Sequence, residues 1–67
     1  MILFVNEKKL ILFEGATVKD ALQMFGNNAL TKIEKGYAEV LDAHGNTIGI
    51  NGALHESIQI FFRIIDK

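Results

Sequence analysis

A single helical stripe, with short β-prone runs on both sides of it, most limits the folds open to this chain. Its apolar residues recur at the spacing of one face of an α-helix: Val18, Ala21, Leu22 and Phe25. Thr17 precedes the stripe and Asp20 follows three positions later, a pattern typical of a capped helix start. Gly26, followed by Asn27 and Asn28, is typical of a helix end in the left-handed conformation. We therefore predict a helix of about two and a half turns between Thr17 and Gly26.

Most other apolar residues fall into short runs rich in Ile, Leu, Phe and Val, which predict β-strands. These runs are residues 2–5, 10–13, 37–41, 47–50 and 57–65. The predicted order of elements is therefore β-β-α-β-β-β. Residues 42–45, Asp-Ala-His-Gly, fit a type I turn and predict a second hairpin. Residues 29–35 fit either a helical turn or a packed loop, and their pattern does not choose between the two.

One helix with four or five strands predicts an α+β fold, in which the apolar stripe of the helix covers one face of a mixed sheet. Because the helix lies between the first hairpin and the later strands, the right-handed crossover rule places the final strand parallel to the first. This arrangement is the β-grasp. No linker, internal repeat or low-complexity segment interrupts the sequence, so we expect residues 1–67 to form one domain.

Composition and charge exclude several other classes of protein. The 67 residues include no Cys, so neither disulfides nor thiol chemistry is expected. The formal charge of −1 gives little electrostatic reason to bind nucleic acid. The apolar opening, residues 2–5, is shorter than a signal peptide or a membrane-spanning helix requires. We therefore expect a cytoplasmic protein that does not contact membranes.

Two stretches of the sequence resemble a known family. LFEGATVKDAL, residues 12–22, resembles the strand-to-helix joint of the ThiS and MoaD sulfur carriers and of TGS domains. GNTIGINGALHESIQI, residues 45–60, is similar to the second half of the same proteins, with their Asn-Gly turn and final strand. The resemblance covers nearly the whole chain and implies a ubiquitin-like β-grasp fold. It points to neither an enzyme nor a bound cofactor.

The departures from this family bear most on function. The sulfur carriers work through a C-terminal Gly-Gly tail, whereas this chain ends RIIDK, residues 63–67, and has no glycine after Gly52. The usual Asn-Gly of the first hairpin reads Asn6-Glu7, and Ser57 replaces the usual Gly before the last strand. We therefore expect a non-catalytic protein-interaction module. The alternatives are a sulfur carrier in thiamine or molybdopterin biosynthesis and a TGS-like domain that contacts RNA through a small lysine patch.

The two faces of the predicted sheet locate the expected interaction site. A sheet covered by a helix on one side should alternate apolar and polar residues, but these strands are apolar on both sides. If Leu3 and Val5 face the helix, the opposite face carries Ile2, Phe4, Ile11, Phe13 and Phe61. Such a patch exceeds what soluble monomers normally expose. We expect these five residues to contact a second copy, in a homodimer or higher oligomer, or another protein. The alternatives are that residues 29–36 cover this face or that the exposed residues are scattered.

No residue pattern indicates a catalytic, metal or cofactor site. His44 and His55 lie eleven positions apart without Cys, a spacing atypical of zinc ligands. Ser57 and Thr17 are not in a nucleophile-elbow pattern, and the glycines do not match a phosphate-binding loop. We therefore expect no catalytic residue and no bound metal or cofactor.

Overall fold

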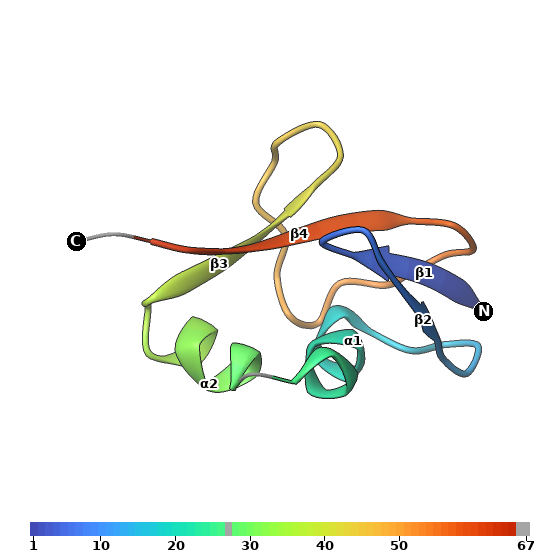
Figure 1. The fold of residues 1–67 in the computed structure, drawn as a ribbon, viewed down its shortest axis with the longest axis horizontal. Helices are drawn as coiled ribbons and strands as arrows, with labels where there is room; N and C mark the ends of the chain where they lie inside the picture. The colour runs from blue at the N-terminus through green and yellow to red at the C-terminus, as the bar shows by residue number, and fades with distance from the viewer. Residues whose placement is uncertain (27, 66–67) are drawn as a thin grey trace.

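The computed structural model describes residues 1–26 and 28–65 of the chain. They form an α+β structure with a four-stranded mixed sheet in the order β2-β1-β4-β3. The elements are β1 (Ile2–Val5), β2 (Lys8–Ile11), α1 (Val18–Phe25), α2 (Ala29–Glu34), β3 (Ala38–Asp42) and β4 (Gln59–Ile64). The central strands β1 and β4 run parallel, as the crossover rule predicts, and the two outer pairs are antiparallel. Both helices lie on the same side of the sheet (Figure 1).

The predicted helix α1 is confirmed at both ends. The Asp20 carboxylate accepts hydrogen bonds from the backbone N–H of Thr17 at 2.9 Å and from its hydroxyl at 3.1 Å. At the other end, Gly26 has a φ of +85° and donates its N–H to the Leu22 carbonyl. A positive φ suits glycine because it has no Cβ. The apolar stripe of α1 is buried beneath the sheet.

Residues 29–34 form a second helix, so the prediction of a single helix is wrong. Ala29 is 1% exposed in the core, and Leu30 and Ile33 pack against it. Because α2 lies beside α1, it adds to the helical layer. The alternative in which residues 29–36 cover the opposite face of the sheet is therefore wrong as well.

The segment between β3 and β4 does not form the predicted fourth strand at residues 47–50. It makes only an isolated bridge, between Leu41 and Thr47, before it crosses to α1. There the Ile50 carbonyl accepts the N–H of Lys19 at 2.8 Å, and the Gly52 carbonyl accepts that of Val18 at 3.0 Å. The first N–H groups of a helix have no partner within it. The segment therefore pairs with β3 only as far as Ile48, and the carbonyls of Ile50 and Gly52 then supply those partners.

The first hairpin turns through Asn6 and Glu7, which have φ values of +51° and +68°. Two positive φ values are typical of the type I′ turn that suits two-residue hairpins. The Asn6 side chain also reaches β4. Its Oδ1 accepts the Phe62 N–H at 2.8 Å and its Nδ2 donates to the Phe62 carbonyl at 3.0 Å. Asn6 therefore extends the pairing of β1 with β4 beyond the end of β1.

The core lies between the sheet and the helical layer. Its most completely buried side chains come from β1, β3, β4 and α1: Leu3, Leu22, Ile60, Val5, Val18 and Val40. Neither α1 nor α2 is both long and apolar enough to cross a bilayer, and no other helix occurs among the described residues. The chain end that was compared with the carrier tail includes Asp66 and Lys67, which lie outside the described residues, as does Asn27.

Candidate functional site

The face of the sheet opposite the helices carries four of the five residues predicted for the interface. Strand pairing sets Ile2 opposite Ile11, and Phe4 opposite Lys9 and Gln59. Leu3 and Val5 of β1 are fully buried on the helix side, so the alternate residues Ile2 and Phe4 point to the opposite face. Phe61 follows the fully buried Ile60 in β4 and shares this face. Ile2, Phe4 and Phe61 are half-buried, and Ile11 is 66% exposed.

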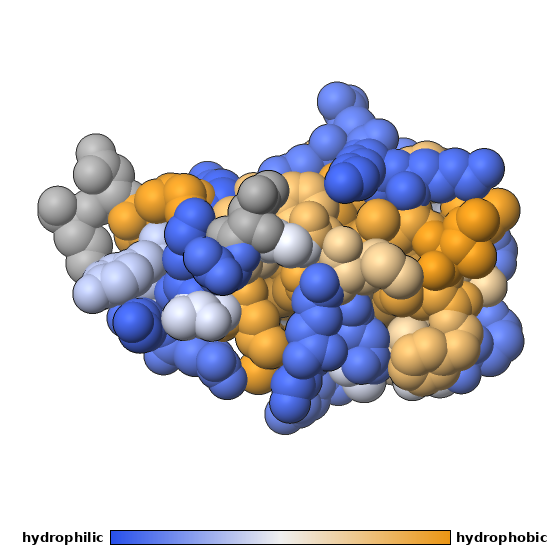
Figure 2. Space-filling view, turned by 60° about the horizontal axis from the view of Figure 1, so that its bottom comes forward, coloured by the Kyte–Doolittle hydropathy of each residue, from blue (hydrophilic) through white to orange (hydrophobic). Residues whose placement is uncertain are grey.

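Phe13 lies beyond the end of β2, near Ile11 but apart from the other three predicted residues. The second strand ends at Ile11, two positions earlier than the predicted strand 10–13. Phe13 is 62% exposed and borders a shallow groove of about 410 Å³ between the end of β2 and α1, together with Met24 and Gln23. In Figure 2 apolar residues gather at this end of the molecule. Phe13 therefore adjoins an edge of the sheet beside α1.

One residue of this face was missed from the sequence. Leu41 of β3 is half-buried and pairs with Phe61. Its neighbours Ala38 and Val40 are buried on the helix side, so strand alternation carries the signal that would have identified it. We call Ile2, Phe4, Ile11, Leu41 and Phe61 the open face.

Polar side chains lie beside the apolar residues of the open face. At one end Glu39 and Arg63 pair across β3 and β4, and the Arg63 guanidinium donates to the Glu39 carboxylate. Lys9 and Gln59 flank Phe4 on the neighbouring strands. The open face therefore has polar groups at one end and beside Phe4 at its centre.

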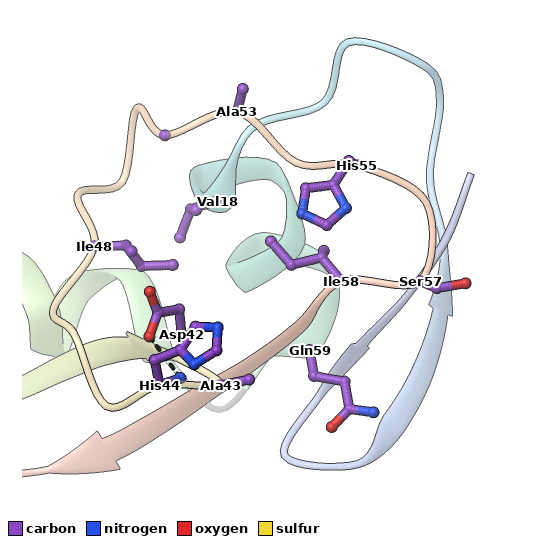
Figure 3. Close-up of a pocket in the computed structure, with 11 residues that line it drawn as sticks. Val18, Asp42, Ala43, His44, Ile48, Ala53, His55, Ser57, Ile58 and Gln59 are labelled. Carbon is purple, nitrogen blue, oxygen red and sulfur yellow. Dashed lines mark hydrogen bonds between the residues drawn. The ribbon is translucent and has the colours of Figure 1, made fainter.

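The structure brings the two histidines to one cavity, which the sequence did not predict (Figure 3). The cavity has a volume of about 610 Å³ and lies between the segment that follows β3 and the start of β4. Val18, Ile48 and Ile58 give it an apolar lining. His44 and His55 reach it because the chain crosses to α1 and returns between them.

The polar side chains that line this cavity include Asp42, His44, His55 and Ser57. Among the described residues no three His, Cys, Asp or Glu side chains gather closely enough to hold a metal ion. The His55 Nδ1 atom lies 3.2 Å from the backbone oxygen of Glu56. Ser57 points away from both imidazoles in Figure 3. Both histidines therefore line the cavity, and no hydrogen bond joins either imidazole to Ser57 among the described residues.

Asp42 holds the turn at the edge of this cavity, and its effect on stability should depend on pH. The N–H groups of Asn46 and His44 donate to its carboxylate at 2.9 and 2.8 Å and lower its pKa below the ordinary value of 3.8. A carboxyl whose pKa is lower in the folded state stabilises the fold above its unfolded pKa and loses that effect as the pH falls through the folded pKa. We expect wild type to lose its stability advantage over Asp42→Asn on acidification below about pH 4.

Thermal unfolding of both proteins, from about pH 6 down to about pH 2, measures this difference. Asn keeps an oxygen acceptor for both N–H groups but does not titrate, so it is the matched control. A difference in Tm that stays constant across this range would contradict the assignment.

Comparisons of the chain with protein-family models, curated proteins and solved structures found no match.

Proposed function

We propose that this chain is a non-catalytic β-grasp module that binds other proteins, or a second copy of itself, through the open face. The proposal rests on the position of the open face in the fold. Five large apolar side chains from all four strands lie on the side of the sheet that neither α1 nor α2 covers. The β-grasp assignment is supported by the parallel pairing of the first and last strands and by the helices packed on one side of the sheet.

The size of the patch indicates weak to moderate binding. Fully burying one side chain of this kind contributes about 1.5 to 3 kcal/mol. Because four of the five are already half-buried, their burial in an interface would supply on the order of 5 to 10 kcal/mol before the cost of association. A micromolar complex requires about 8 kcal/mol net. The polar side chains of the open face must therefore contribute binding free energy if the complex is tight.

A charge placed in the open face tests the proposal. Phe61→Glu would force a carboxylate into any interface formed there, and we expect self-association to weaken at least about tenfold. The measurement is the dissociation constant from sedimentation equilibrium at micromolar to millimolar concentrations. Ile64→Glu is the control, because Ile64 lies on the same strand, is 55% exposed and follows the helix-side alternation.

Two outcomes would contradict the proposal. If Phe61→Glu associates as tightly as Ile64→Glu and wild type, the open face is not the contact surface. If wild type stays monomeric over the whole range, the open face does not join two copies.

A further inference from the structure

The outer edge of β2 carries backbone groups that no described residue pairs with. Met1 and Leu12 exchange hydrogen bonds in both directions, at 2.8 and 2.9 Å. Antiparallel pairs alternate between hydrogen-bonded and non-hydrogen-bonded positions. Ile2–Ile11 and Phe4–Lys9 are therefore non-hydrogen-bonded pairs, and the N–H and C=O groups of Lys9 and Ile11 point outward, away from β1.

The other edge of the sheet is covered in part. Along β3, the Val40 carbonyl accepts the N–H of Ile48 at 2.9 Å, and the N–H of Asp42 donates to the Asn46 carbonyl at 2.9 Å. The segment after β3 thus occupies part of that edge. An unpaired edge is a template for another strand, and no segment of the described residues pairs with the outer side of β2, whereas β3 is paired there at Val40 and Asp42.

Apolar side chains line this free edge. Ile11, Phe13 and Met24 are 66%, 62% and 56% exposed, and all three border the groove of about 410 Å³ between β2 and α1. They are three of the most exposed large apolar residues in the described chain. A strand added at this edge would cover Ile11 and Phe13 as well as pair with the backbone.

The charges along the edge differ between its two ends. Lys8 and Lys9, both exposed, lie at the start of β2. Glu14 lies just past the other end, with its side chain 85% exposed, although its carboxylate is also 3.5 Å from the Met1 amino nitrogen. An antiparallel copy of this edge would bring the basic end of each chain to the acidic end of the other. This is charge complementarity of the edge with itself.

We propose that a second copy of the chain pairs with the edge of β2, antiparallel to it, about a two-fold axis at Ile11. The outward N–H and C=O groups of the two Ile11 residues then bond to each other, and those of Lys9 face Phe13 of the other copy, whose carbonyl also accepts the N–H of Ala16 at 3.2 Å. Lys8 comes opposite Glu14 of the other copy, twice by symmetry. The two four-stranded sheets become one eight-stranded sheet. The inference goes beyond the proposed function, because it names the partner and uses an edge that the open-face proposal does not require.

The neighbouring registers are less favourable. The outward groups belong to odd-numbered residues, so only registers that set those residues opposite one another complete the ladder. An axis at Lys9 would set the two Lys9 side chains opposite each other, and like charges directly opposite destabilise a strand pair. An axis at Leu10 would set Lys8 opposite Leu12 and Glu7 opposite Phe13, with no ion pair. Of these three registers, the one with its axis at Ile11 is therefore the one that pairs opposite charges.

Hydrogen exchange gives the direct test. We expect the amide hydrogens of Lys9 and Ile11 to exchange rapidly in dilute protein and to gain at least about tenfold protection when the protein is concentrated into the dimer. Amide exchange followed by NMR at micromolar and millimolar concentrations measures this change. Association through the open face would leave these two amides unprotected, so the two proposals fail separately. A dimer without this protection, or a monomer at millimolar concentration, would overturn the inference.

Charge exchange tests the register. Glu14→Lys places like charges at both symmetric contacts, and we expect the dimer dissociation constant to rise about tenfold. The double variant Lys8→Glu, Glu14→Lys restores both pairs and should recover most of the affinity. Glu34→Lys, exposed on α2, makes the same change in net charge and should leave the affinity unaltered. Equal affinities for Glu14→Lys and Glu34→Lys, or no recovery in the double variant, would overturn the assigned register.

Discussion

We expect Leu3→Ala to lower the free energy of unfolding by about 2 to 5 kcal/mol. Leu3 is 0% exposed at the centre of β1, between the sheet and the helical layer. Truncation removes buried methyl groups and leaves a cavity that a close-packed interior fills only in part. A domain of this size buries a smaller share of its surface than larger domains do and has little stability in reserve. The loss would therefore leave a large fraction of the variant unfolded at ordinary temperature.

Urea unfolding followed by circular dichroism measures this loss. Ile64→Ala is the control, because Ile64 is 55% exposed at the end of β4. It removes similar apolar atoms from a position that water already reaches, and it should change the free energy of unfolding by less than about 0.5 kcal/mol. Equal losses for the two variants would mean that Leu3 is not in the core.

The second large effect is expected at Asn6. We expect Asn6→Ala to destabilise the fold by about 2 to 3 kcal/mol, from two sources. It removes both side-chain hydrogen bonds to the backbone of Phe62, each worth about 0.5 to 1.5 kcal/mol. It also places a Cβ without a polar group at a φ of +51°, where non-glycine residues other than Asn and Asp are disfavoured.

Two further variants separate these contributions. Asn6→Gly keeps the turn and loses both hydrogen bonds, whereas Asn6→Asp keeps the acceptor for the Phe62 N–H and the tolerance of a positive φ. We expect Asp to cost least and Ala most, as measured by chemical unfolding. If Gly restores wild-type stability, the turn alone accounts for the effect and the link to Phe62 contributes nothing.

The sequence predicted best the elements whose signals are local. The bounds of β1 and α1 match the prediction, because β1 is a continuous apolar run stopped by Asn6 and α1 is a periodic apolar stripe with clear end signals. The helix α2 has only six residues and two weakly placed apolar side chains, so it gave no decisive periodicity. The prediction of a strand at residues 47–50 failed for a different reason. The Ile50 carbonyl bonds to the first turn of α1, a long-range contact that no local pattern encodes.

The candidate site was predictable as far as strand alternation reaches. Alternation placed Ile2, Phe4, Ile11 and Phe61 on one face of the sheet, as the register shows. It failed at Phe13, because β2 ends two residues before that position. The free edge of β2 could not be found in this way, since it depends on strand order. The charges along this edge, by contrast, can be read from the sequence between Lys8 and Glu14.

The parallel pairing of β1 with β4 determines when this chain can fold. The strand pairs Phe4–Gln59 and Val5–Ile60 join residues 55 positions apart. Closing so long a loop must precede the burial of Leu3 and Val5 against Ile60, and such non-local contacts slow folding. During synthesis the first hairpin and both helices emerge while the middle of the sheet still lacks a strand. The side of β1 that carries Leu3 and Val5 stays accessible to chaperones and to other nascent chains until residues 59–64 have left the ribosome.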